Sequence, residues 1–379
     1  MSEHSATPAS VVLSGYGPVG RAYVDHLAAH GEALADRHGA RLRLAAVRTS
    51  SAEYLPPPAE GTDAEGTGDA DDTDDTGDTG DAEGTGDTEG TGGTEGWGTW
   101  APPPPRSAWG PLPSLAETLD RTGAGVLVQC VPSSPEVRDQ AAAEALLALR
   151  RGVHVVTATK SHLLSHWREL GRAAVEGGSL IRISGATGAA LPAGDLARAG
   201  VRGLGCRTIR ACPNGTATFV LDRLAAGDSL ADAVAEARRR GIAEADPSAD
   251  LSGSDAATKA RLLAALLWGW DASAVRTETE PVDDGTARAA REAAASGHRL
   301  RAVASASADE PLLVRVRLER TAPGDPLHAL TGPEKAVVYG CPDAGDITVS
   351  GGRSSPLGAA LAMVKDTLDV AVPRRLGFG

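Results

Sequence analysis

The sequence predicts an α/β protein in which a parallel sheet with helices on both faces is followed by an α+β unit with a mixed sheet. Three observations lead to this fold class. Short apolar runs alternate with helical patterns through the first half of the chain. The first of these runs meets a glycine-rich turn that opens a helix. Past about residue 183 the rhythm changes to amphipathic helices followed by alternating strands, which is typical of a separate unit.

The first unit is predicted from buried strands that alternate with helices. An apolar run at 11–13 precedes a pattern in which Val19, Tyr23, Leu27 and Leu34 are spaced for one helical face. Repetition of this strand–helix–strand unit makes the strands parallel. The other expected elements are strands at 42–47, 125–130, 153–157 and 181–183 and a helix at 136–150.

The second unit is predicted from capped helices and alternating strands. Ser229 is expected to cap a helix that ends at Gly241, because its side-chain oxygen can accept from a free backbone N–H and glycine tolerates the left-handed position after a helix. A second helix is expected from Ser254 to Trp268. The remaining expected elements are strands at 312–318, 336–339 and 346–349 and a closing helix at 357–370.

Charge is distributed unevenly along the 379 residues. The chain has 37 basic and 50 acidic residues and a net charge of −13, but residues 60–95 hold 14 acidic and no basic residues. The remainder has 37 basic and 36 acidic residues and is close to neutral. This balance argues against a protein that neutralises nucleic-acid phosphates over a broad basic face.

The acidic run belongs to a segment at 56–113 that lacks apolar periodicity and is rich in Gly, Thr, Asp, Glu and Pro. Like charges repel there, and little can be buried to offset the entropy of ordering the chain. We interpret 56–113 as a disordered acidic insertion that acts as a solvated spacer. The alternative is a cluster of carboxylates that binds a cation or a basic partner.

Cysteine spacing and hydropathy indicate a soluble protein of the cytoplasm. The cysteines at 130, 206, 212 and 341 lack the paired spacing of a zinc or redox site, so reduced thiols and no metal site are expected. The first ten residues carry no basic region typical of a secretory signal, and no apolar run reaches the ~18 residues that a membrane span needs. We expect neither membrane nor nucleic acid as a partner.

A G-x-G-x-x-G pattern stands at Gly15, Gly17 and Gly20, after a predicted strand and before a predicted helix. The first glycine permits a tight turn, the second lets backbone approach a pyrophosphate, and the third allows close helix packing. The phosphates would meet the helix N-terminus. This position predicts a Rossmann-type dinucleotide-binding domain, although a purely structural turn in a chain with 46 glycines is the alternative.

The end of the second strand bears on cofactor choice. Sites selective for NAD usually place an acid there for the ribose 2′-hydroxyl, whereas this strand ends in Arg48. Arg48 could bind a 2′-phosphate, so the sequence favours NADP as the cofactor, with NAD as the alternative. An exposed arginine with no phosphate partner would give the same sequence.

Lysine usage points to proton chemistry. The chain has only four lysines among 37 basic residues. A buried lysine can lose its proton and act as an acid or base, whereas arginine stays charged. Lys160 ends a predicted strand at the carboxyl edge of the sheet, where such folds bind ligands. Lys259 follows Asp255 by four residues on a predicted helix, and a surface ion pair is the alternative for these two.

An acidic loop leads into the helix of Lys259. Glu244, Asp246, Asp250 and Asp255 fall within twelve residues. Carboxylates close to one or two lysines suit a substrate that bears an ammonium and a hydroxyl group. A solvated acidic turn is the other interpretation.

These motifs resemble the homoserine dehydrogenase family. The resemblance rests on GIAEADPSADLSGSDAATK at 241–259, NGT at 214–216, TATK at 157–160 and the stretch at 351–366. It spans nearly the whole chain apart from the insertion. It implies NAD(P)-dependent interconversion of L-homoserine and L-aspartate 4-semialdehyde by a homodimer.

The resemblance also implies a role for individual residues. Glu244 matches the acid that holds the substrate ammonium, and Asp250 and Asp255 match further substrate-binding acids. Lys259 and Lys160 match the two lysines assigned to proton transfer. We favour Lys259 as the acid/base on the substrate hydroxyl and Lys160 as the group that orients substrate against nicotinamide. The residues expected to contact the cofactor are Gly15, Gly17, Val19, Gly20, Arg48, Lys160 and Gly351.

Several positions depart from the family pattern. Thr159 stands where an asparagine is usual before the strand-end lysine. Ser184 replaces a glutamate at the start of the loop at 184–192, which supplies a monovalent-cation site in some members, so the cation is in doubt. The glycine loop at 351–356 is also altered. The chain ends at Gly379, which leaves no room for the regulatory domain that some members append, so feedback inhibition through such a domain is not expected.

The expected domains are an NAD(P)-binding domain at 1–160, interrupted by the insertion at 56–113, a catalytic and dimerisation domain at 161–340, and a C-terminal segment at 341–379 that returns to the cofactor domain. Two other functions stay open. The altered loops favour a dehydrogenase of the same fold for a different amino-acid alcohol or aldehyde. A non-catalytic nucleotide-binding paralogue that engages a partner through its acidic insertion is the third hypothesis.

Overall fold

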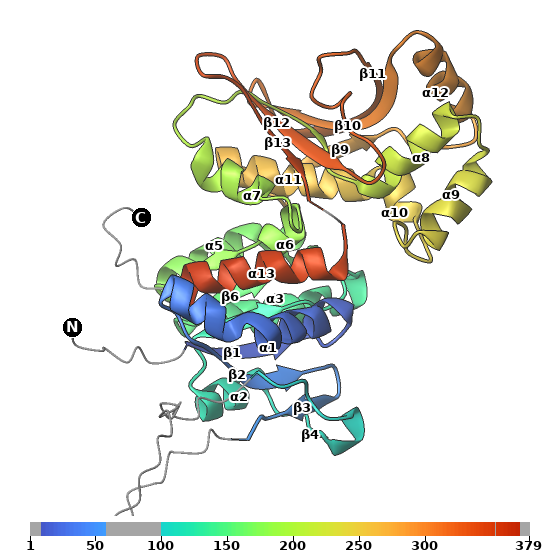
Figure 1. Cartoon of the computed structure of the whole chain (residues 1–379). Coiled ribbons are helices and arrows are strands. Elements are labelled where there is room, and N and C mark those ends of the chain that lie inside the picture. Colours follow the sequence, from blue (N-terminus) through green and yellow to red (C-terminus); the bar gives the residue numbers. More distant parts are fainter. Residues whose placement is uncertain (1–8, 58–99, 353, 372–379) are drawn as a thin grey trace, which may run out of the picture.

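The computed structural model describes residues 9–57, 100–352 and 354–371. Two units lie one above the other in Figure 1, each built on its own sheet. The expected insertion falls largely outside the described residues, since positions 58–99 are not among them. The predicted fold class, a Rossmann-type unit followed by an α+β unit with a mixed sheet, is confirmed.

The first unit contains, within the described residues, a seven-stranded sheet of order β4-β3-β2-β1-β5-β6-β7. The strands β2, β1, β5, β6 and β7 run parallel, and β3 and β4 form an antiparallel edge. Chain order reverses direction between β1 and β5, the point at which open α/β sheets bind ligands. The strand bounds are β1 Ala9–Ser14, β2 Leu42–Arg48, β3 Ala52–Tyr54, β4 Gly110–Pro111, β5 Val126–Gln129, β6 His154–Thr157 and β7 Ile181–Arg182.

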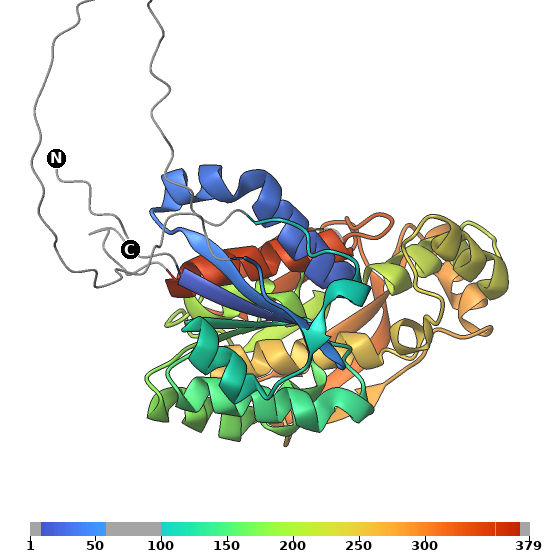
Figure 2. The ribbon, with the colours of Figure 1, turned by 90° about the horizontal axis from the view of Figure 1, so that it is seen from below.

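Helices cover both faces of this sheet, as Figure 2 shows from below. One face is packed by α1 and α13 around Leu13, Val24 and Met363. The other is packed by α2, α3 and α5 around Leu127, Leu149 and Leu170. Capping fixes α2, because Ser114 and Glu117 form a reciprocal capping box. The helix bounds are α1 Pro18–His38, α2 Leu115–Thr122, α3 Pro135–Arg150, α4 Ser161–Ser165, α5 Trp167–Glu176, α6 Ser184–Thr187 and α13 Pro356–Ala371.

The last helix returns to the first unit. In α13, Thr367 shares a 2.9 Å hydrogen bond with Tyr23 of α1, and both side chains are fully buried. The two helices lie side by side in Figures 1 and 2. The chain therefore closes the dinucleotide-binding unit with a segment more than 300 residues away in sequence.

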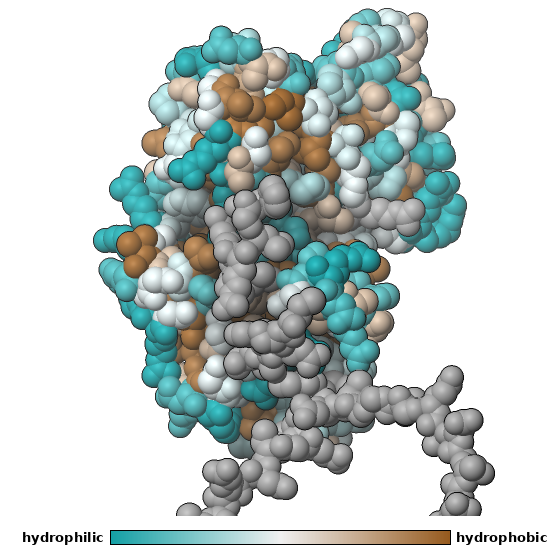
Figure 3. All heavy atoms as spheres, turned by 60° about the vertical axis from the view of Figure 1, so that its left-hand side comes forward, coloured by the Kyte–Doolittle hydropathy of each residue, from teal (hydrophilic) through white to brown (hydrophobic). Residues whose placement is uncertain are grey.

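The second unit contains, within the described residues, a six-stranded mixed sheet of order β13-β12-β8-β10-β11-β9. Helices α7 and α11 pack on it around Ile209, Leu263 and Val337. Apolar side chains also gather on an exposed face of this unit (Figure 3). Its elements are α7 Ala193–Asp195, η2 Leu196–Gly200, β8 Thr208–Cys212, α8 Gly215–Ala225, α9 Leu230–Arg239, α10 Ser248–Leu251, α11 Ser254–Trp268, β9 Arg276–Thr279, α12 Thr286–Ala295, β10 Arg299–Ser307, β11 Glu310–Thr321, β12 Lys335–Cys341 and β13 Gly345–Gly351.

The sheets place the domain limits differently from the sequence. The first sheet extends past the expected boundary at 160, because β7 still pairs with β6. The second sheet extends past 340, because β13 pairs with β12 along its whole length. Among the described residues of the expected C-terminal segment, β13 therefore belongs to the second unit and α13 returns to the first.

The expected insertion at 56–113 is too long at its C-terminal end. Residues 100–113 pack on the first unit: Trp100 is buried, donates to the carbonyl of Leu42 and meets Tyr23 edge to face. Trp109 contacts the rings of Tyr16 and Tyr54 after the short helix η1 (Arg106–Ala108), just before β4. The proline-rich composition of this stretch led us to miss Trp100 and Trp109. These two aromatic side chains pack on the first unit and order the segment.

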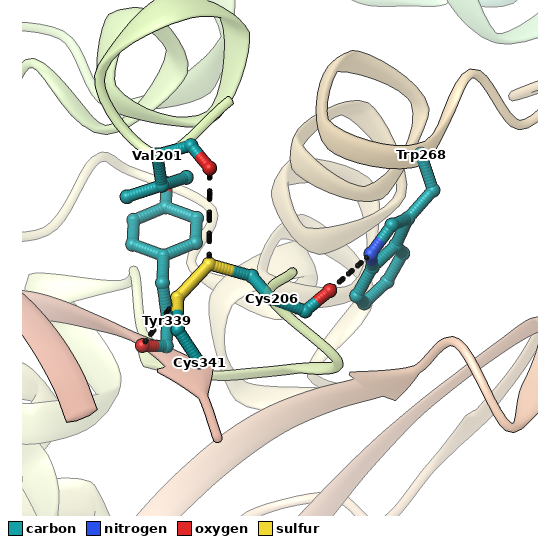
Figure 4. Close-up of a disulfide and its surroundings, with 5 residues drawn as sticks. All are labelled: Val201, Cys206, Trp268, Tyr339 and Cys341. Atoms are coloured by element: carbon teal, nitrogen blue, oxygen red, sulfur yellow. Dashed lines mark hydrogen bonds between the residues drawn. A yellow bond between two sulfur atoms is a disulfide. The ribbon is translucent and has the colours of Figure 1, made fainter. Parts of the chain in front are cut away.

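The expectation of four reduced thiols is wrong for one pair. A disulfide joins Cys206 to Cys341 (Figure 4), while Cys130 and Cys212 are free thiols. It ties the segment before β8 to the end of β12, beside Trp268, whose indole donates to the carbonyl of Cys206. Sequence spacing missed the pair because 135 residues separate the two cysteines and only the sheet brings them together.

Within the described residues, no helix combines the length and hydropathy that a membrane span requires.

Candidate active site

The glycine turn after β1 has the conformation and the open space that a pyrophosphate needs. Gly15 has φ +103°, and a Cβ there would come within 2.8 Å of the backbone of Cys130. A Cβ on Gly20 would lie 2.2 Å from the carbonyl oxygen of Gly15. No atom lies within 4 Å of a Cβ built on Gly17, so the backbone is open to a ligand at this glycine alone of the three.

The first turn of α1 offers its backbone N–H groups to an anion. Gly17 is the N-cap, no side chain caps the helix, and the first turn has no acidic residue. The partial positive charge of a helix N-terminus therefore faces the open side of the turn. Val19 is half-buried and packs on the core under α1, so it shapes the turn from beneath. These residues fit a dinucleotide.

Arg48 is not available to a 2′-phosphate, which corrects the sequence expectation. Its side chain is 4% exposed and its guanidinium pairs with Glu53 at 3.0 Å. It also donates to Thr118 and, at 3.0 Å, to the carbonyl of Pro113. Arg48 and Glu53 are directly opposite each other in the β2–β3 ladder. The sequence did not predict this ion pair, because the short hairpin that places Glu53 opposite Arg48 lies just before the acidic run and was not recognised.

Lys160 lies at the carboxyl edge of the first sheet, one turn of chain beyond β6. Its backbone N–H donates to Ser133 at 2.8 Å, which ties it to the loop after β5. Its neighbour Thr159 is buried and donates to the carbonyl of Val131 at 2.8 Å. Thr159, which departs from the family pattern, thus joins the same two loops through its hydroxyl.

A cluster of acids and lysines faces Lys160 from the second unit. Asp255, in the first turn of α11, accepts a 2.6 Å hydrogen bond from Lys259 one turn further along. The Nζ of Lys160 is 3.6 Å from the other carboxylate oxygen of Asp255. Lys259 also donates to the carbonyl of Pro213 at 3.1 Å. The two predicted lysines therefore contact one carboxylate. The side chain of Lys259 is 15% exposed and that of Lys160 is 30% exposed.

Asn214 organises the acids of this cluster. As N-cap of α8 it accepts from the N–H of Ala217, and its amide nitrogen donates to Asp250 at 2.6 Å and to Asp255 at 2.8 Å. The sequence predicts Asn214 only as part of the family resemblance, and its bridging of the two acids was not predicted. An asparagine at the head of a helix, close to an acidic loop, is the signal that could have indicated it.

Electrostatics keep Asp255 ionised. Burial by itself raises the pKa of this carboxyl. The charges of Lys259 and Lys160 and the hydrogen bonds from Lys259 and Asn214 outweigh burial and hold its pKa well below the usual range. At neutral pH the site therefore holds a carboxylate between two lysines.

The acidic loop is only partly gathered into the cluster. Asp250 joins through Asn214, whereas Glu244 is exposed between α9 and α10. Within the described residues Glu244 forms no ion pair with Lys160 or Lys259. Asp246 is exposed and accepts from the N–H of Ser248, which stabilises the loop.

The loops that depart from the family pattern meet beside the cluster. A Cβ on Gly185 would lie 2.9 Å from the Cβ of Ala158, next to the Lys160 segment. Gly351, with φ +107°, ends β13, and a Cβ on Gly352 would lie 2.7 Å from the N of Leu191. The predicted cofactor contact Gly351 therefore belongs to a loop that packs on 184–192, at the junction of the two units.

The fold and this cluster define the class of the protein as an NAD(P)-dependent oxidoreductase: a dinucleotide-binding turn and a set of titratable groups share one sheet edge. Comparison with known proteins gives a family likeness. Residues 192–368, which form most of the second unit and α13, match the family model for homoserine dehydrogenase.

Relatives that bear the same name are similar over longer stretches of this chain. The homoserine dehydrogenase of Methanocaldococcus jannaschii is 27% identical over 262 residues, which cover 68% of this chain and 76% of that protein. The homoserine dehydrogenase of Corynebacterium glutamicum is 34% identical over 160 residues, 42% of this chain and 36% of the relative. An NAD(+)-dependent homoserine dehydrogenase of Pseudomonas canavaninivorans is 28% identical, with 65% and 71% covered.

Two solved structures show the same fold. The homoserine dehydrogenase of Thiobacillus denitrificans superposes with a TM-score of 0.74 at 22% identity, covering 96% of this chain and 73% of that one. A hyperthermophilic archaeal homoserine dehydrogenase in complex with NADPH superposes with a TM-score of 0.69 at 22% identity, covering 96% and 98%.

Proposed function

We propose that the protein interconverts L-homoserine and L-aspartate 4-semialdehyde with NADP or NAD. The observation that supports this most directly is the convergence of Lys160, Lys259 and Asp255 at the edge of the sheet that bears the dinucleotide turn. This geometry provides carboxylates for an ammonium and a proton acceptor for a hydroxyl, next to a place for the nicotinamide.

The dinucleotide is held by the chain's own backbone in this proposal. Gly15, Gly17 and Gly20 form the turn, and the N–H groups of the first turn of α1 meet the pyrophosphate. When bound, the nicotinamide supplies hydride chemistry at its C4. An NAD(+)-dependent relative and an NADPH complex in the family support the use of either cofactor. With Arg48 engaged by Glu53, no 2′-phosphate ligand is assigned.

The second unit binds the amino acid. Asp250 and Asp255, aligned by Asn214, attract the substrate ammonium, and the exposed Glu244 on the loop before α10 is the acid that the family resemblance assigns to the same group. Oxidation of the alcohol requires removal of the hydroxyl proton and of a hydride from the same carbon. Lys259 takes the proton as the neutral amine and becomes an ammonium, which the carboxylate of Asp255 and the carbonyl of Pro213 stabilise. Lys160 orients the substrate from the cofactor side.

The test is absorbance at 340 nm with purified protein, L-homoserine and NAD or NADP. A rise establishes the reaction and fixes the cofactor preference. Protein that binds NADP but gives no rise with homoserine, and no fall with aspartate 4-semialdehyde and NADPH, contradicts the proposal.

A second candidate substrate follows from the altered loops. The segments at 184–192 and 351–356 both depart from the family pattern, and Gly352 of the second packs on Leu191 of the first beside the cluster. Such changes favour a different amino-acid alcohol or aldehyde. Turnover of a homologous amino alcohol at least ~10-fold better in kcat/KM, equal to about 1.4 kcal/mol of transition-state preference, would establish this alternative.

We further propose a homodimer in the cytoplasm that acts in amino-acid biosynthesis and engages neither nucleic acid nor membrane. The apolar face of the second unit in Figure 3 supports self-association through that unit. Size-exclusion chromatography with light scattering tests the oligomeric state. A monomer at micromolar concentration would exclude a stable dimer.

A further inference from the structure

Lys335 is a buried ammonium between the two altered loops. It begins β12 and is 1% exposed. Its Nζ donates to the carbonyl of Gly188 at 2.8 Å. In the β12–β13 ladder its direct partner is Gly351. One lysine thus contacts the loop at 184–192 through its side chain and the loop at 351–356 through its strand.

The turn that Lys335 holds has an unfavourable backbone conformation. Ala189 has φ +51°, a left-handed value that costs a non-glycine residue ~1 kcal/mol. The preceding Gly188 is so crowded that a Cβ would lie 2.2 Å from the carbonyl oxygen of Leu191. A turn of this kind persists only where its surroundings determine it. The bond from Lys335 to the Gly188 carbonyl supplies such a contact.

A second lysine holds the beginning of the same loop. Lys365 of α13 donates to the hydroxyl of Ser184 at 3.0 Å and pairs with Asp195 and Asp366. Ser184 in turn donates its hydroxyl to Asp366 at 2.8 Å, and its N–H also meets Asp366. The beginning of the loop, at Ser184, and its middle, at Gly188, are therefore both fixed by groups of this chain.

The loop does not fit a monovalent cation. Such ions are held by carbonyl and carboxylate oxygens that replace their hydration shell. The Gly188 carbonyl already accepts from Lys335 and, at 3.1 Å, from the N–H of Leu191, which uses both of its lone pairs. Ser184 brings no carboxylate of its own and is bonded to Lys365 and Asp366. A buried ammonium in the same turn also repels a cation.

Lys335 lies near the catalytic cluster as well. A Cβ on Gly215, which follows Asn214, would lie 2.4 Å from the carbonyl oxygen of Pro333, so the segment before Lys335 supports the start of α8. Burial and then the charge of Lys259 lower the pKa of Lys335 to about 8, and Asp255 acts in the opposite direction. The turn, Lys335 and Lys259 are therefore parts of one environment.

We propose that Lys335 is a positioning residue whose ammonium holds the 184–192 turn in place of a monovalent cation, and that the protein therefore needs neither Na⁺ nor K⁺. This inference rests on the proposed dehydrogenase activity for its kinetic part only. Lys335 acts through the loop and touches neither substrate nor cofactor.

The experiment compares the wild type with Lys335→Ala and Lys335→Met in NaCl, KCl and choline chloride at equal ionic strength. Melting temperature and kcat/KM are measured in each salt. We expect the wild type to give the same values in all three. Lys335→Ala opens space and frees a carbonyl, so it should lose at least ~10-fold in kcat/KM in choline and recover part of it, with a higher melting temperature, in NaCl or KCl. Lys335→Met fills the space without charge and should not recover.

A matched control separates this effect from the loss of any buried cation. Arg301 of β10 is equally buried and donates to the carbonyls of Leu327 and Leu330, away from the catalytic cluster. Arg301→Met should lower the melting temperature without any difference between sodium and choline.

The proposal is overturned if the wild type melts higher or turns over faster in Na⁺ or K⁺ than in choline, or if Lys335→Ala keeps wild-type kcat/KM in every salt. The melting temperature is measured without substrate. A protein that is inactive on homoserine would therefore contradict the proposed function, while the melting temperatures in the three salts would still test the role of Lys335. Should both variants fail to fold, the ion series of the wild type still decides.

Discussion

The ammonium of Lys160 lies 3.6 Å from the carboxylate of Asp255 and joins the two units across the candidate site. Lys160 follows β6 of the dinucleotide-binding sheet, whereas Asp255 opens α11 of the second unit. Since the same carboxylate accepts from Lys259 at 2.6 Å, one acid fixes both lysines. The groups that we propose to handle the proton are thus held in place by contacts within this chain, which is what an oriented active site requires.

Replacing Lys259 should remove turnover and leave the cofactor bound. A general acid or base contributes about 10²–10⁴-fold to rate, and Lys259 lies on the second unit, away from the glycine turn. We expect Lys259→Met to lower kcat by at least ~10²-fold while the Kd for NADPH, measured by fluorescence, stays within about twofold. Arg288→Gln, on the exposed face of α12, is the control and should behave as wild type. Loss of NADPH binding in Lys259→Met would show that the lysine is assigned to the wrong part of the site.

Asn214 should act through the acids that it aligns. Asn214→Ala removes the cap of α8, worth about 1 kcal/mol, together with both amide hydrogen bonds to Asp250 and Asp255. Asn214→Ser keeps a capping oxygen but provides no amide to bridge the carboxylates. We expect the serine variant to retain most of its stability in urea denaturation and still show a raised KM for homoserine. If Asn214→Ser regains both the stability and the KM for homoserine that Asn214→Ala loses, then Asn214 only caps the helix.

The fold was predictable from sequence where local pattern and topology agree. The apolar runs and the turn at Gly15, Gly17 and Gly20 specify a parallel sheet with a phosphate-binding edge, and Ser229 caps its helix as expected. The convergence of Lys259 and Asp255 also followed from spacing, since residues four apart share a helix face.

What the sequence could not reveal depends on contacts between distant segments. Arg48 appeared to be a phosphate ligand because nothing local marks Glu53 as its cross-strand partner. Cys206 and Cys341 meet only after the second sheet forms. Lys335 and Gly188 are 147 residues apart, so no local sequence pattern predicts the hydrogen bond between them. Trp100 packs on Tyr23 although its flanks have the composition of a linker.

The buried pair Arg48–Glu53 should govern stability rather than cofactor choice. Removing one partner of a buried ion pair typically costs about 3–5 kcal/mol when the other charge is left uncompensated. Glu53 also pairs with Arg121, so Arg48→Met should lower the free energy of unfolding by less than this, and the double variant Arg48→Met/Glu53→Met should lower it less still. The ratio of kcat/KM for NADP over NAD should not change in folded protein. A selective loss of NADP activity in Arg48→Met would restore Arg48 as a 2′-phosphate ligand.

The disulfide can be tested by counting the cysteines that react with an alkylating reagent. Protein isolated without reductant and alkylated under denaturing conditions should show two modified cysteines by mass spectrometry, Cys130 and Cys212, and four after reduction. Closing a span of 135 residues constrains the unfolded chain by about 5 kcal/mol in the chain-entropy model. Reduction should therefore lower the midpoint of denaturation, and Cys206→Ser should lower it whether or not reductant is present. Four alkylated cysteines without reduction would show that all four are reduced thiols, as the sequence spacing predicts, and that the disulfide is absent.

Lys335 should make the protein more stable as pH rises above neutrality. Burial and the charge of Lys259 lower its pKa to about 8 in the folded protein, whereas the unfolded chain keeps the ordinary value of 10.5. Below pH 8 both states hold the proton, and the full cost of burying the charge is present. Between pH 8 and 10.5 the unfolded state binds more protons than the native state, so this residue's share of the free energy of unfolding increases with pH. Urea denaturation at pH 7.5–10 should show this slope in the wild type and less of it in Lys335→Met.

The same titration can be observed at one residue, because the chain has only four lysines. Labelling with [ε-13C]-lysine should give one signal with a midpoint near pH 8 that disappears in Lys335→Met. The groups that surround this ammonium are Lys259 and Asp255 of α11 and the Gly188 carbonyl, so Lys259→Met should raise the midpoint by removing a neighbouring positive charge. A Lys335 signal that titrates near 10.5 would show that the ammonium is solvated and that the 184–192 turn is held by other contacts.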